Sequence, residues 1–93
     1  MIIGICELNI YLPDCHSLKD KRSILKKTIN VLRKKYNISI SEIGNKNSWK
    51  KCILAISIVS DNNRQIDKIL QNIIKGIELI NNIELIDYHI SII

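Results

Sequence analysis

The stretch that decides the fold is Lys51–Val59, which reads KCILAISIV. Nearly every position is apolar, and a short run of this composition is typical of a strand whose two faces are both at least partly covered. Such a strand lies inside a sheet. The segments before and after it are therefore expected to supply its neighbours.

Upstream of this stretch, the sequence predicts two more strands and a helix. Residues 37–43 (NISISEI) alternate between apolar and polar side chains and form a strand, followed by a turn at 44–49. Residues 18–36 form an amphipathic helix with Ser17 as its N-cap. Residues 2–12 form the first strand, which Pro13 ends. The apolar stripe of the helix consists of Leu18, Leu25, Ile29, Leu32 and Tyr36.

Downstream, residues 62–80 predict a second helix, capped by Asp61 or Asn62, and residues 83–93 predict a last strand. The element order β-α-β-β-α-β, with right-handed crossovers, gives an α+β, ferredoxin-like fold. We expect one domain over residues 1–93, with a four-stranded antiparallel sheet and both helices on one face. The first and third strands are then central, which makes Cys6 and Cys52 small buried hydrophobic residues.

Charge is unevenly distributed along the 93 residues. The net charge is +5, and the whole excess lies in residues 1–46, most of it in the first predicted helix. An uneven basic patch favours an anionic partner such as nucleic acid. The alternative is a solvated helix face made rich in lysine by an AT-rich coding sequence.

The basic helix supplies the candidate phosphate-binding residues. Three cations crowd its first turns, where the helix dipole disfavours positive charge, so their placement suggests a binding role. Free backbone N–H groups at that end would add to the attraction for a phosphate. Four of the five candidates line one flank of the apolar stripe. The candidates are Lys19, Lys21, Arg22, Lys26 and Arg33, and all but Lys21 lie on that flank.

Three parts of the sequence resemble the YlxP-like family, also called domain of unknown function 503. They are the string His16-Ser17-Leu18-Lys19-Asp20-Lys21-Arg22, residues 36–43 and the single Trp49. The resemblance spans essentially the whole chain and departs from the family at residues 45–48. It implies a ferredoxin-like fold and a bacterial cytoplasmic protein. Genes of this family often lie beside those for translation initiation factor two and ribosome-binding factor A, which suggests ribosome assembly or translation.

No catalytic or cofactor motif is found. Cys15 beside His16 would suit a nucleophile, but adjacent loop residues usually point apart, and no third group orients them. The three cysteines form neither a disulfide framework nor a zinc motif. Phosphate-binding loops and hydrolase motifs are absent. We therefore expect no enzyme activity, no metal and no cofactor. With no signal peptide and no apolar run near the ~18 residues of a membrane helix, a cytoplasmic protein is expected.

The sheet face without helices offers a second candidate surface. Ile53, Ala55 and Val59 form an apolar strip there, which predicts a homodimer face unless the C-terminus or a loop covers it. An RNA-recognition motif would need aromatic residues on both central strands, and only Tyr11 lies near such a position. Trp49 is either a plug over the core edge or a stacking platform for RNA.

The leading hypothesis is a non-enzymatic protein associated with RNA or the ribosome, which binds phosphates through its basic helix. The alternative is a protein-interaction module that dimerises or docks a partner through the open sheet face.

Overall fold

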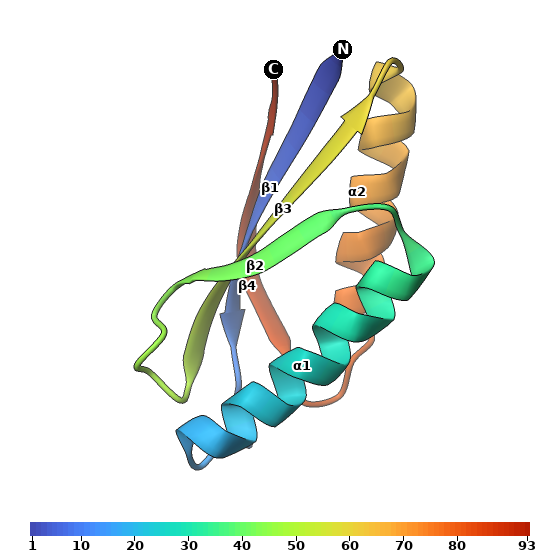
Figure 1. Ribbon diagram of the computed structural model, residues 1–93. Helices are drawn as coiled ribbons and strands as arrows, with labels where there is room; N and C mark the ends of the chain where they lie inside the picture. The colour runs from blue at the N-terminus through green and yellow to red at the C-terminus, as the bar shows by residue number, and fades with distance from the viewer.

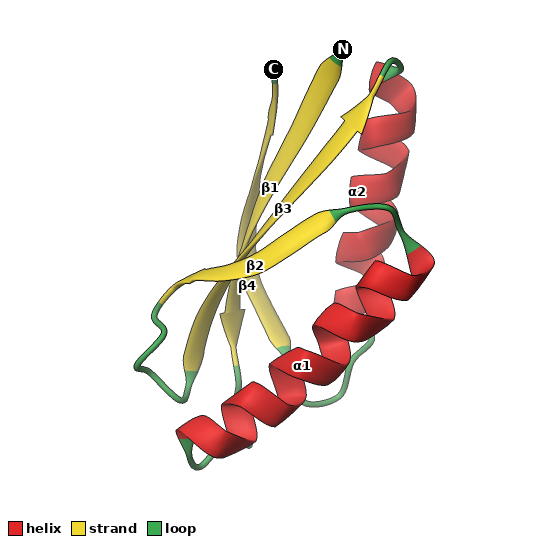
Figure 2. Cartoon of the chain, viewed as in Figure 1, coloured by secondary structure: helices red, strands yellow, loops and turns green.

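The computed structural model describes residues 1–93 and has the predicted element order (Figure 1). The strands are β1 (Ile2–Tyr11), β2 (Ser39–Gly44), β3 (Lys51–Ser60) and β4 (Glu84–Ile92), and the helices are α1 (Leu18–Lys35) and α2 (Asn63–Glu78). The strands form one antiparallel sheet in the order β2-β3-β1-β4, and both helices lie on the same side of it (Figure 2). The predicted ferredoxin-like fold and its central strands are confirmed.

The buried core lies between the sheet and the two helices. Cys6 and Cys52, on the paired central strands, are both fully buried, as predicted. Helix α2 packs against β1, β3 and β4, whereas α1 packs against β2, which is an edge strand. Helix α1 therefore overhangs a free edge of the sheet, and this offset positions the candidate site.

Both helices begin at the residues that capping rules select. The Ser17 hydroxyl accepts a hydrogen bond from the Asp20 N–H at 3.0 Å, so Ser17 is the N-cap of α1. Of the two candidates for α2, Asn62 is the N-cap, and its side chain accepts from the Gln65 N–H at 3.2 Å. Neither helix is long and apolar enough to cross a membrane.

Two register shifts interrupt the sheet. One lies between Asn9 and Ile10 where β1 pairs with β4, and the other lies between Glu42 and Gly44 where β2 pairs with β3. The first shift leaves Ile86 without a partner on β1, 57% exposed on the open face. The second leaves Ile43 without a partner on β3, and Ile43 is 51% exposed. Bulges of this kind re-aim side chains and are common beside binding sites.

No helix covers the other face of the sheet, which is open along its whole length (Figure 2). Of the predicted apolar strip, Ile53 and Ala55 are half-buried and Val59 is exposed. The C-terminus does not fold over this strip. Instead, Ile93 extends the sheet in its own plane through two backbone hydrogen bonds with Ile3, at 2.8 and 3.0 Å.

Candidate functional site

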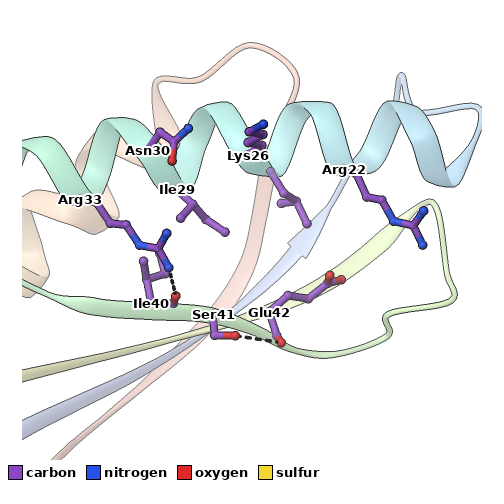
Figure 3. Close-up of a pocket in the computed structure, with 9 residues that line it drawn as sticks. Arg22, Lys26, Ile29, Asn30, Arg33, Ile40, Ser41 and Glu42 are labelled. Atoms are coloured by element: carbon purple, nitrogen blue, oxygen red, sulfur yellow. Dashed lines mark hydrogen bonds between the residues drawn. The ribbon is translucent and has the colours of Figure 1, made fainter.

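A groove of about 370 Å³ runs between α1 and the free edge of β2 (Figure 3). Its floor is apolar, made by Leu25 and Ile29 of α1 and by Ile40 of β2. Arg22, Lys26 and Arg33 of α1 overhang this floor, so three of the five predicted phosphate-binding residues share one cavity. The groove exists because the apolar stripe of α1 rests on β2 while the basic flank of the helix extends beyond the sheet.

Arg33 is held across the groove by the edge strand. Its guanidinium donates a hydrogen bond to the Ile40 carbonyl oxygen at 3.1 Å, which fixes the charge above the groove floor (Figure 3). Arg22 and Lys26 are exposed and form no ion pair. The groove therefore presents two free cations and one oriented guanidinium, a set that suits several phosphate oxygens at once.

Glu42 is the one acidic residue that lines the groove, and its charge is already compensated. Its Oε2 lies 2.7 Å from the Nζ of Lys21, and this ion pair is the only polar contact of that buried oxygen. The alternation of residues 37–43 places Glu42 on the helix side of the sheet, among apolar neighbours. An acid on the core-facing side was a visible signal of this pair, but sequence reasoning missed it.

Lys21 is a buried structural residue, and its predicted role as a phosphate ligand is corrected. Its side chain is 1% exposed. Besides the ion pair, its Nζ donates hydrogen bonds to the backbone carbonyls of Asn45 at 2.7 Å and Ser48 at 2.6 Å. Two hydrogen bonds and one ion pair therefore hold this ammonium inside the chain. We call Lys21, Glu42 and the carbonyls of Asn45 and Ser48 the lysine latch.

The N-terminus of α1 is also less open to an anion than the sequence suggested. The Asp20 N–H is capped by Ser17, and the Asp20 carboxylate accepts from the His16 N–H at 3.3 Å. A carboxylate thus already occupies the positive end of the helix. Lys19 remains exposed, about one turn before Arg22. The available cations lie along the helix, in and beside the groove, and not at its tip.

Cys15 and His16 do not form a catalytic pair. The Cys15 side chain is fully buried, and its thiol donates to the Ser17 carbonyl at 3.3 Å, whereas His16 is exposed. Burial raises the pKa of the Cys6 thiol to about 11 and that of the Cys52 thiol to about 12. These two thiols are therefore protonated at neutral pH and unsuited to nucleophilic attack. No group of three or more His, Cys, Asp or Glu residues is placed to hold a metal ion.

Trp49 lies at the end of the β2–β3 turn and is 44% exposed. It directly follows Ser48, whose carbonyl belongs to the lysine latch. Both predicted roles of the indole, a plug over the core edge and a stacking platform for RNA, stay predictions.

Comparison with known proteins adds the family and the fold. The family model described as "Protein of unknown function (DUF503)" matches residues 3–90. "Uncharacterized protein YlxP" of Bacillus subtilis (strain 168) is 36% identical over 83 residues, which cover 89% of this chain and 90% of that protein. Two solved structures share the fold at low identity. A de novo designed protein with ferredoxin fold has a TM-score of 0.57 at 17% identity, covering 100% of this chain and 84% of that one. The de novo designed protein Foldit4 has a TM-score of 0.56 at 15% identity, covering 98% and 96%. The chain therefore belongs to the DUF503 family.

Proposed function

We propose that this member of the DUF503 family is a non-enzymatic RNA-binding protein that acts in ribosome assembly or translation. RNA phosphates would lie along the basic flank of α1, with Arg22, Lys26 and Arg33 contacting them in the groove and Lys19 contacting them just beyond its end. The observation that carries this proposal is the absence of acidic partners. None of the four cations is ion-paired, and the one acid in the groove is bound to Lys21.

The geometry supports a polyanion more than a single small anion. Lys19 and Arg33 are fourteen positions apart on one helix, which corresponds to about 21 Å along its axis. That length spans several phosphates of one strand. The open groove has an apolar floor and no enclosed pocket for one ligand. Phosphate contacts of this kind position RNA without selecting its sequence.

The test compares two charge reversals of equal size on different faces. The first replaces Lys19, Arg22 and Lys26 with Glu. The matched control replaces Arg64, Lys68 and Lys75 of α2 with Glu, which makes the same change in net charge. Arg33 is left intact because it also bonds the edge strand.

Both variants and the parent are titrated with a structured RNA, and each is followed through ribosomal gradients at low and high salt. The groove variant should lose binding while the α2 variant keeps most of it. For about four phosphate contacts, the parent's log affinity should fall against log salt with a slope of about −3. Equal RNA binding by the groove variant and the parent would refute the proposal.

A second candidate is a homodimer through the open sheet face, the alternative use of the strip Ile53, Ala55 and Val59. The observation that favours it is the exposed apolar surface at one end of that face, where Val59 is 66% exposed and Ile93 is 72% exposed. Sedimentation over a wide concentration range tests it, with Val59→Lys as the disrupting variant. A parent that sediments as a monomer at every concentration excludes the dimer.

A further inference from the structure

A second hollow, of about 440 Å³, lies on the open face of the sheet, on the opposite side from the groove. Four of the residues that line it are cross-strand partners on β1 and β3, with Tyr11 opposite Lys51 and Asn9 opposite Ile53. Its size falls in the range of small-molecule sites, about 300–1,000 Å³. Besides these four residues, its lining includes Asn45 and Ile86.

Two irregular backbone positions build the walls of the hollow. The register shift between β1 and β4 turns Ile86 onto the open face, where a regular strand would point it at the helices. Asn45 has a φ of 60°, in the left-handed region that few non-glycine residues adopt. Its carbonyl is held by Lys21 of the lysine latch, so the turn that carries the Asn45 side chain is fixed in place. Lys21 thus holds the turn beside the hollow and also neutralises Glu42 in the groove.

The polar side chains of the hollow form no hydrogen bond or ion pair within the chain. The amides of Asn9 and Asn45, the Tyr11 hydroxyl and the Lys51 ammonium make no side-chain hydrogen bond or ion pair; Asn45 and Lys51 bond only through their backbone. The Tyr11 ring, Ile53 and Ile86 lie beside these groups. An apolar surface with a few convergent polar groups is the usual composition of a ligand site.

We propose that this hollow binds one nucleotide unit, with the base against Tyr11 and between Ile53 and Ile86. The amides of Asn9 and Asn45 would pair with the polar edge of the base, because an amide offers both a donor and an acceptor. The Lys51 ammonium would hold the attached phosphate. One base on one tyrosine is a smaller contact than the two or three stacked bases of an RNA-recognition motif, which this face still lacks the aromatic residues to form.

The nucleotide could come from two sources, a free mononucleotide or an unpaired base of RNA. The RNA form deepens the proposed function and rests on it, because the groove would hold the flanking phosphates while the unpaired base enters the hollow. The hollow itself does not rest on the groove, since its lining residues other than Asn45 lie on β1, β3 and β4.

Nuclear magnetic resonance on the full chain tests the hollow directly. Each of the four ribonucleoside 5′-monophosphates is titrated and backbone amide shifts are followed, with ribose 5-phosphate and inorganic phosphate as controls that lack a base. The monophosphates should shift the amides of Tyr11, Lys51 and Ile86, and the controls should not. Tyr11→Ala should weaken binding about tenfold or more, whereas Tyr11→Phe should keep it within a few-fold. Lys51→Ala should weaken binding, and Lys46→Ala, which lies beside Asn45 on the β2–β3 turn but outside the hollow, should not.

A second titration separates the two sources. An RNA duplex with one bulged nucleotide is compared with the same duplex without the bulge. Shifts at the hollow with the bulged RNA alone support the RNA form. Shifts with mononucleotides but with neither RNA support the hollow as a site for a free nucleotide and overturn its RNA form. If neither mononucleotides nor bulged RNA shift the hollow, the inference is wrong, even where the α1 charge reversal abolishes RNA binding and the proposed function stands.

Discussion

Replacing Lys21 with methionine should destabilise the fold by about 3 kcal/mol. Methionine fills much of the same volume, so the loss comes from the polar contacts and not from a cavity. Removing one partner of a buried ion pair typically costs about 3–5 kcal/mol, because the remaining charge is left uncompensated. The Glu42 side chain is 22% exposed, so water can partly solvate it, and the lower end of that range applies. For a domain of this size, 3 kcal/mol lowers the melting temperature by about 12–24 °C.

Urea denaturation followed by circular dichroism measures this loss. Lys19→Met is the matched control, because Lys19 is exposed on the same helical turn and should change the free energy of unfolding by no more than about 0.5 kcal/mol. The double variant Lys21→Met/Glu42→Leu should recover part of the loss, since it removes the orphaned charge as well. If the free energy of unfolding of Lys21→Met lies within 1 kcal/mol of the parent's value, the structural role of the lysine latch is refuted.

Two further predictions concern stability. Because burial raises the pKa of Cys6 from 9.0 to about 11 and that of Cys52 from 9.0 to about 12, the folded chain keeps these protons at alkaline pH while the unfolded chain loses them. The free energy of unfolding should therefore fall as pH rises above about 9, and less steeply in Cys6→Ala/Cys52→Ala; equal slopes would contradict the assignment. At Gly4 an added Cβ would collide with the Ile66 Cγ2, whereas at Gly76 it would meet nothing within 4 Å. Thermal melts should show Gly4→Ala destabilised by about 1–3 kcal/mol and Gly76→Ala stabilised by up to about 1 kcal/mol, and the opposite signs would contradict this packing.

The fold could be predicted from the sequence because its signals are local and repeated. The apolar run at residues 51–59 requires a covered central strand, and the stripe along α2 buries five residues at helical spacing. Capping rules placed the starts of both helices at Ser17 and at one of two neighbouring residues, of which Asn62 is the one used. These features depend on residue type and spacing alone.

The candidate site was only partly predictable, because Lys21 has the position of a core residue and the chemistry of a surface residue. Lys21, Leu25, Thr28 and Leu32 are spaced by four, three and four, and all are buried, so they form the true inner row of α1. The charge of Lys21 favours a surface position, whereas its spacing in that row places it inside. Its partners Asn45 and Ser48 lie 24 and 27 positions away, beyond the reach of any local pattern.

The hollow was missed for a different reason, which is that strand alternation fails at a bulge. Regular alternation from Asp87 and His89 would place Leu85 on the open face and Ile86 against the helices. The register shift exchanges these two residues, with Leu85 opposite Ile10 and partly buried against the core. The alternation of apolar and polar residues does not reveal where a bulge inserts a residue. The position of Ile86 in the wall of the hollow is therefore visible only in the structure.

The lysine latch gives the basic helix and the open sheet face a common support. Its ion pair neutralises the Glu42 carboxylate that lines the groove. Its hydrogen bond to the Asn45 carbonyl holds the turn at the rim of the hollow. One side chain can do both because helical spacing turns Lys21 inward, whereas Lys19 and Arg22, on either side of it, remain exposed. The concentration of cations at the start of α1 therefore has two physical explanations and not one. The inward cation holds Glu42 and the β2–β3 turn in place, and the outward cations are the ones that the proposed RNA phosphates would contact.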